Sequence, residues 1–183
     1  MSASVRKRGW ASPRQHPSIG VWYSSRLQVP SRIVNGIEEL RSLTGQEIGL
    51  SDWFLVDQQR ITQFAETTED RQWIHLDAER AGVESPYGST IAHGFLTLSM
   101  LSEFSRQAVD IRGDFKMRIN YGLNRVRFPA PVPVDSRIRG RFVLAKVEDF
   151  PGGVQVVWNV TVEVEGGVKP ALVAEWVTRI YLA

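Results

Sequence analysis

The stretch that decides the fold runs from Thr68 to Ser102 and reads TEDRQWIHLDAERAGVESPYGSTIAHGFLTLSMLS. It places an acid and a histidine, Asp70 and His75, five positions apart, and then passes through a glycine-bearing turn into the most apolar helical run of the chain. A helix that is apolar on nearly all sides should be buried. We therefore expect the rest of the chain to form a scaffold around this segment.

Composition narrows the class of protein. The chain has 183 residues, of which 43% are hydrophobic and 23% are charged, as in ordinary globular domains. No apolar run approaches the roughly 18 residues of a membrane span. Cysteine is absent, which excludes disulfides, thiolate catalysis and cysteine-ligated metal centres. Because this fits a reducing compartment, we expect a cytoplasmic protein without membrane contact.

The positive charge is concentrated at the N-terminus. Residues 1–32 contain six Lys and Arg residues and no acid, so residues 33–183 carry 16 basic and 20 acidic residues. Nucleic-acid binding by the whole domain is therefore not expected. We interpret 1–32 as a basic, disordered extension and 33–183 as a single domain; a transit peptide and a basic arm for an acidic partner are alternatives for the extension.

The first half of the domain has helical patterns. The spacing of apolar residues predicts a helix around 37–43 that stops at Gly45, a strand over 52–56 and a helix that begins after Asp57 and ends near Thr68. Asp70 and His75 would then lie in one loop, and Asp77 would cap a short turn that Gly82 closes.

The second half has one long helix followed by strands. A helix is expected from Ser89 or Thr90 to about Ala108. Alternating or β-branched residues then predict strands at 137–144, 154–164 and 171–182, separated by Gly-Gly turns. This order predicts an α+β fold in which an antiparallel curved sheet wraps around a central buried helix.

Asp70 and His75 are the candidate catalytic pair. A carboxylate and an imidazole that converge on one water can take a proton from it and return a proton to a substrate carbon. Histidine titrates near neutral pH, and burial can raise the pKa of a carboxyl group into that range. The spacing alone is weak evidence, because most such pairs are surface or helix-capping residues.

His93 and Gly94 form the second candidate group, at the start of the apolar helix. Backbone N–H groups in the first helical turn lack intrahelical partners, and a glycine there allows a substrate carbonyl to approach closely. Such an amide is an oxyanion hole, often worth several kcal/mol in the transition state. Alternatively, Gly94 only permits close packing and His93 is a buried, hydrogen-bonded polar residue.

These residues also carry a resemblance. TTEDRQWIHLDAERA followed by STIAHGFLTLSMLS resembles the MaoC-like dehydratases, the (R)-specific enoyl-CoA hydratases of the hot-dog fold, and especially their nodulation-protein-N-like members. The similarity extends through INYGLNRVRFPAPVPVDSRIRG and VEVEGGVKPALVAEWVTR, and so covers about 36–182. Two separated motifs in the same order make the resemblance specific.

The resemblance implies roles for individual residues. Asp70 and His75 match the catalytic acid–base pair, Gly94 matches the glycine whose amide faces the thioester oxygen, and Ser102 matches a serine on the central helix near the pair. The usual Asp-x-Asn-Pro-x-His core departs here, since Gln72 and Trp73 replace Asn and Pro. Gln72 can still orient the loop by hydrogen bonding.

The implied reaction is reversible syn hydration of a trans-2-enoyl-CoA to an (R)-3-hydroxyacyl-CoA. Neither a metal nor a redox cofactor is expected, because the polarised thioester supplies the electrophile, and coenzyme A enters as part of the substrate. The family assembles as homodimers, which we expect here. The sequence leaves open which of Asp70 and His75 activates the water, and the preferred acyl length.

Several basic residues are candidates for substrate contacts. Arg137, Arg139 and Arg141 would share one face of a strand and could attract the phosphates of coenzyme A, or they are simply solvated. Arg125 and Arg127, together with His93 and Gln72, are further candidates for binding the substrate.

Three rival interpretations remain. Hot-dog thioesterases bind the same ligands, but the paired Asp70 and His75 favour hydration. A non-catalytic acyl-CoA-binding subunit would lack that pair. A metal site built from Asp70, His75 and His93 is conceivable but offers few ligands.

Overall fold

The helices of the described chain come before the long strands of the sheet. The computed structural model describes residues 32–183, so the predicted extension lies outside the described residues except for Arg32, which begins the first strand. In chain order the elements are β1 (Arg32–Asn35), α1 (Gly36–Ser42), β2 (Glu47–Leu50), β3 (Phe54–Val56), α2 (Gln58–Thr68), α3 (Trp73–Leu76), α4 (Ala78–Glu84), α5 (Gly94–Ser99), α6 (Leu101–Ala108), β4 (Val109–Arg112), β5 (Phe115–Arg127), β6 (Ser136–Phe150), β7 (Gly153–Val164) and β8 (Leu172–Leu182).

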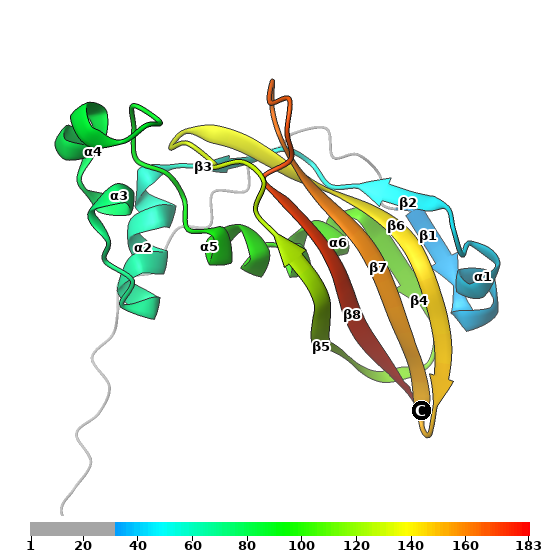
Figure 1. Cartoon of the computed structure of the whole chain (residues 1–183). Coiled ribbons are helices and arrows are strands. Elements are labelled where there is room, and N and C mark those ends of the chain that lie inside the picture. Colours follow the sequence, from blue (N-terminus) through cyan, green and yellow to red (C-terminus); the bar gives the residue numbers. More distant parts are fainter. Residues whose placement is uncertain (1–31) are drawn as a thin grey trace, which may run out of the picture.

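The main sheet is antiparallel and strongly curved. Its strand order is β2-β6-β7-β8-β5, and β3 also pairs with β6 (Figure 1). On β6 the side chains at 138, 142 and 144 are buried, while the arginines between them face outward, as period-two alternation requires. The three predicted strands at 137–144, 154–164 and 171–182 are confirmed as β6, β7 and β8, although β6 continues to Phe150.

Helices α5 and α6 lie against the concave face of this sheet (Figure 1). Phe104 of α6 is fully buried, and Gly140 of β6 lies directly beneath it. A Cβ at position 140 would stand 2.7 Å from the Phe104 Cβ, so only glycine lets helix and strand approach this closely. The α+β arrangement of a curved antiparallel sheet around a central helix is confirmed.

The central helix differs from the prediction in three ways. It begins at Gly94 rather than at Ser89 or Thr90, and it is interrupted at Met100. It is also not buried on all sides, because the Phe95 side chain is 69% exposed. The late start follows from the pairing of the preceding residues, which are extended: Ile91 forms a β-bridge with Pro133.

The N-terminal part of the described chain contributes helix α1, two short strands of the main sheet and one strand of a separate pair. The predicted helix at 37–43 is α1, which buries Leu40, and the chain turns at Gly45 with a φ of +86°. The predicted strand at 52–56 is confirmed only over Phe54–Val56. A separate parallel pair, β1 with β4, joins the N-terminal strand to the segment after α6.

Helices α2, α3 and α4 form a group beyond one end of the strands (Figure 1). Asp57 caps α2, since its carboxylate accepts a hydrogen bond from the Arg60 amide at 2.8 Å, and Asp77 caps α4 in the same way through Arg80. Gly82 is not a helix stop, because α4 continues to Glu84. No helix within 32–183 is long and apolar enough to span a membrane.

Candidate active site

Asp70 lies just after α2, where the chain leaves the helix. Glu69 ends α2 in the left-handed conformation with a φ of 60°, and Asp70 follows it on an exposed loop. Its side chain lines a pocket of about 510 Å³. The position of Asp70 in a loop is as predicted.

His75 is on a short helix rather than in that loop, which corrects the prediction. It belongs to α3, and its side chain is only 8% exposed. The Nδ1 atom lies 2.7 Å from the carbonyl oxygen of Ile91. A carbonyl can only accept, so we assign the hydrogen to Nδ1, which leaves the Nε2 lone pair free to accept a proton.

Three further contacts hold α3 in place. The Gln58 side-chain amide donates to the His75 carbonyl at 2.8 Å, and its oxygen accepts from the Thr90 hydroxyl at 2.6 Å. The Ile91 amide donates to the Ile74 carbonyl at 3.1 Å. Sequence reasoning missed Gln58 and Thr90, because a glutamine in the first turn of one helix gives no local sign of a partner 32 residues away.

Burial sets the protonation of His75. Removal from water lowers the pKa of His75 below its ordinary value of 6.5; the hydrogen bond to Ile91 opposes this shift, nearby His93 adds to it, and Asp70 opposes it. The first effect is the largest, so His75 is neutral at neutral pH and is available as a base.

His93 bridges the two candidate catalytic residues. It is 3% exposed, and its ring stacks on that of His75 with centroids 3.7 Å apart and an interplanar angle of 26°. Its Nε2 atom lies 2.9 Å from the backbone oxygen of Asp70. The predicted substrate-binding residue thus contacts both members of the pair, and it does not line the pocket at Asp70.

Gly94 is the first residue of α5, where backbone N–H groups have no intrahelical acceptor. It opens on a second hollow of about 230 Å³, separate from the pocket at Asp70. A Cβ at position 94 would meet the Phe128 ring at 3.1 Å. Phe95 lines the pocket at Asp70 and Phe128 lines this second hollow, and the centroids of the two rings are 6.2 Å apart.

Ser102 lies on α6 and lines the same pocket as Asp70, as the resemblance implied. Its hydroxyl oxygen accepts a hydrogen bond from the Asn120 side chain at 3.0 Å, a contact that sequence reasoning missed. The other walls of the pocket are mostly apolar. They comprise Phe64, Thr68, Phe95, Leu98, Ser99, Leu101, Asn120, Tyr121, Gly122, Leu123 and Trp176.

Three other candidates are not brought to this pocket. Gln72 is exposed and precedes α3 without capping it through its side chain. Arg125 and Arg127 lie on the exposed strand β5, and Arg127 donates to the adjacent Val126 carbonyl. Their predicted substrate contacts therefore remain predictions that this arrangement does not favour.

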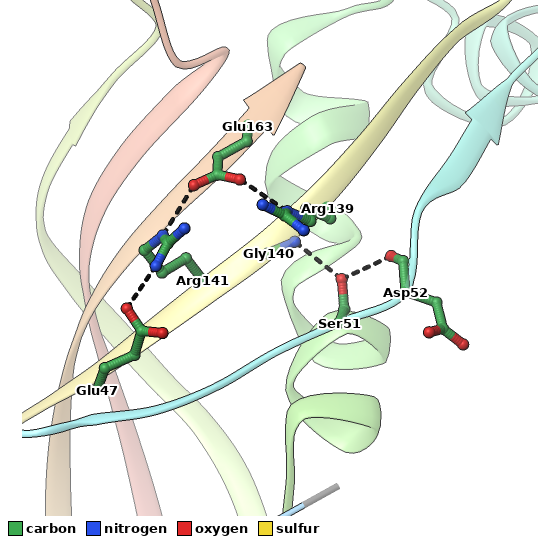
Figure 2. Close-up of polar contacts among 7 residues, drawn as sticks. All are labelled: Glu47, Ser51, Asp52, Arg139, Gly140, Arg141 and Glu163. Carbon is green, nitrogen blue, oxygen red and sulfur yellow. Dashed lines mark hydrogen bonds and ion pairs between the residues drawn. The ribbon is translucent and has the colours of Figure 1, made fainter. Parts of the chain in front are cut away.

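The arginines of β6 are paired with acids. Arg139 and Arg141 both donate to Glu163, and Arg141 also reaches Glu47 (Figure 2). Arg137 pairs with Glu165 in the same manner. These carboxylates neutralise the charges of Arg137, Arg139 and Arg141, which disfavours the predicted attraction of coenzyme A phosphates.

The side-chain ligand atoms of Asp70, His75 and His93 all lie within 4.8 Å of one another. Such a spacing could hold a metal ion. However, one nitrogen of each imidazole already faces a backbone carbonyl, at Ile91 and at Asp70 respectively. The same spacing suits a carboxylate and an imidazole that share one water.

Comparisons with known proteins agree on the family. The model of the MaoC like domain matches residues 39–166. The chain is 48% identical over 149 residues to 3-hydroxyacyl-thioester dehydratase Z of Mycobacterium tuberculosis (81% of this chain, 97% of that protein), and 49% identical over 158 residues to nodulation protein N of Rhizobium leguminosarum bv. viciae (85% and 91%).

A solved structure shows the fold. The unliganded R-hydratase PhaJ1 of Pseudomonas aeruginosa matches with a TM-score of 0.62 at 22% identity, covering 76% of this chain and 83% of that one. The expected hot-dog fold is therefore confirmed. With the family model matching most of the described domain and two relatives near one-half identity, the chain belongs to the MaoC-like domain family.

Proposed function

We propose that this protein catalyses the reversible hydration of a trans-2-enoyl-CoA to an (R)-3-hydroxyacyl-CoA. The observation that carries the proposal is the fixed orientation of His75. Its Nδ1–H is directed to the Ile91 carbonyl, so its free Nε2 lone pair is the proton acceptor in a group that also contains the Asp70 carboxylate. A neutral imidazole beside a carboxylate is suited to general acid–base chemistry on one water.

The proposed reaction has three events, which take place at C3, at the thioester oxygen and at C2 of the substrate. Asp70 and His75 take a proton from a water as its oxygen bonds to C3 of the enoyl group. The electrons of the double bond move toward the thioester oxygen, where the Gly94 amide donates a hydrogen bond to the developing charge. A proton returned to C2 on the same face completes syn addition, and dehydration is the reverse. Each proton transfer by a positioned side chain contributes about 10²- to 10⁴-fold.

The relatives support the type of chemistry. One curated relative is named a 3-hydroxyacyl-thioester dehydratase, and one structural neighbour is an R-hydratase. The (R) configuration, coenzyme A as the carrier and the absence of a metal or redox cofactor are parts of our proposal. The cytoplasmic location of the protein is also part of the proposal.

The assembly is proposed to be a homodimer. Strand β5 pairs with β8 on one side only, and its other edge has no strand partner within the described chain. This edge strand exposes large apolar side chains, which are Met117, Ile119, Tyr121 and Leu123. An uncovered apolar edge strand favours association, and a second copy of the chain can cover it. Sedimentation of the purified protein, compared with a Tyr121→Arg variant, tests this assembly.

The activity is tested with crotonyl-CoA and longer 2-enoyl-CoAs. Loss of the conjugated enoyl absorbance and formation of the (R)-3-hydroxy product are expected, and both should disappear in Asp70→Asn and in His75→Gln. Asp114→Asn is the matched control, because Asp114 is exposed and does not line the pocket at Asp70. Release of free thiol without hydration would show a thioesterase instead. Full hydration by both site variants would contradict the proposed pair.

A further inference from the structure

The buried histidine at the start of α5 has no role in the proton transfers proposed above. His93 is 3% exposed, and among residues 32–183 its Nδ1 atom has no hydrogen-bond partner. Its Nε2 atom faces the Asp70 carbonyl, which can only accept, so Nε2 carries the hydrogen. One ring nitrogen donates to the Asp70 carbonyl, the other is buried, and His93 does not line the pocket at Asp70.

Asp70 lies in an exposed loop after α2. Its side chain is exposed, and the neighbouring Arg71 pairs with Glu66, both of them at the surface. Exposed ion pairs of this kind contribute little to holding a chain segment. The hydrogen bond from His93 is different, because its donor is buried between the rings of His75 and Phe64.

The same residue also connects the acid to the other parts of the site. His93 immediately precedes Gly94, whose amide is the proposed oxyanion donor, and its ring is stacked on the His75 ring. A displacement of His93 would therefore change the position of Asp70 relative to both. A shift of about 1 Å in a reacting group can cost about 10²-fold in rate.

We propose that His93 is a positioning residue, which holds the Asp70 loop against the start of α5 through its Nε2–H and thereby sets the spacing between the acid, His75 and the Gly94 amide. This inference rests on the proposed hydratase function for its effect on rate. The hydrogen bond between His93 and the Asp70 loop belongs to the fold itself, so its effect on the loop can be measured without any substrate.

Two variants separate the hydrogen bond from the ring. His93→Phe retains a ring that can pack between His75 and Phe64 but has no donor. His93→Gln loses the ring, but its side-chain amide can place a donor near the position of Nε2. If the donor is what matters, Gln restores what Phe loses.

The first measurement is hydrogen exchange of the backbone amides at 69–72. Exchange is expected to be faster in His93→Phe and close to the wild-type rate in His93→Gln. Thr44→Val serves as a control variant, since Thr44 is exposed and remote in sequence from the site. Equal exchange in wild type and His93→Phe would overturn the inference.

The second measurement is the hydration rate of 2-enoyl-CoA. In His93→Phe we expect kcat to fall about 10- to 100-fold with KM within about twofold, because binding groups are retained while the acid is misplaced. His93→Gln should retain kcat within about threefold, a rescue on the same scale. Equal losses in both variants would overturn the role of the donor. An inactive wild-type protein would overturn the proposed function instead, while the exchange measurement would still decide whether His93 holds the loop.

Discussion

The imidazole rings of His75 and His93 stack with their centroids 3.7 Å apart, although His75 lies in α3 and His93 is the extended residue before α5. Each ring donates a hydrogen bond to a backbone carbonyl, His75 to Ile91 and His93 to Asp70. The two hydrogen bonds and the ring stacking join α3, the Asp70 loop and the start of α5, which are the three segments that carry the site. These contacts therefore fix the orientation of the proposed base, whose pKa is lowered mainly by burial and further by the neighbouring His93.

The ionisation of His75 predicts a pH dependence of activity. Burial lowers the pKa of His75 below 6.5, so the base is protonated only at a pH below that value. We therefore expect the acid limb of the kcat/KM profile to lie below pH 6.5. A limb above pH 6.5 would contradict a buried His75 as the group that titrates.

The same shift predicts a pH dependence of stability. Below pH 6.5 the unfolded chain binds a proton on this histidine before the folded chain does, so the free energy of unfolding should fall as the pH decreases from that value toward the folded pKa. His75→Gln should remove this part of the dependence. Urea unfolding of wild type and variant at several pH values measures it.

Gln58 should be needed for His75 to act. In Gln58→Leu the His75 carbonyl and the Thr90 hydroxyl both lose their partner, which leaves buried polar groups unpaired. We expect a loss of about 1–3 kcal/mol in the free energy of unfolding and a reduced kcat. Gln46→Leu is the matched control, since Gln46 is exposed and, within residues 32–183, its side chain makes one hydrogen bond, a 3.5 Å contact with the Ser42 carbonyl. Equal stability of the two variants would contradict the proposed role of Gln58.

Gly94→Ala should lower activity more than stability. The added methyl group would stand 3.1 Å from the Phe128 ring and beside the proposed oxyanion amide, so substrate approach is obstructed even if the ring moves. A fall of about 10-fold or more in kcat/KM is expected. Gly82→Ala is the control, because Gly82 lies within α4 and no atom from elsewhere in the described part of the chain would lie within 4 Å of its added Cβ. Full activity of Gly94→Ala would contradict the proposed approach of the carbonyl.

Glu163 should contribute stability above acid pH. Burial acts to raise its pKa, but hydrogen bonds and charges from Arg139 and Arg141 together hold the pKa of Glu163 below its ordinary value of 4.5. The unfolded chain therefore takes up this proton first, so the contribution is present above pH 4.5 and is lost as pH falls through the lower, folded pKa.

Glu163→Gln tests this contribution. We expect the variant to unfold more easily than wild type by about 1 kcal/mol at pH 7, since the group is partly exposed, and the difference should shrink on acidification. Glu38→Gln provides a control, because Glu38 is 91% exposed in its contact with Arg41. A difference that is independent of pH would show that packing, not charge, is responsible.

Local patterns in the sequence determined much of the fold. Asp57 and Asp77 are helix caps, because a short carboxylate reaches the amide three residues ahead whatever surrounds it. The alternation along β6 and the β-branched runs of β7 and β8 specify strands with one buried face, since side chains on neighbouring positions point to opposite sides. Two motifs in order were sufficient to indicate the family.

Tertiary structure alone decided the details of the site. The helix could not start at Ser89 or Thr90, because Ile91 is held by Ile74, His75 and Pro133, residues that are near only after folding. The same is true of the hydrogen bond from Gln58 to the His75 carbonyl and of that from His93 to the Asp70 carbonyl. Their partners lie 17 and 23 positions apart in the chain. Local propensity acts over a few residues, whereas these hydrogen bonds depend on which segments the core brings together.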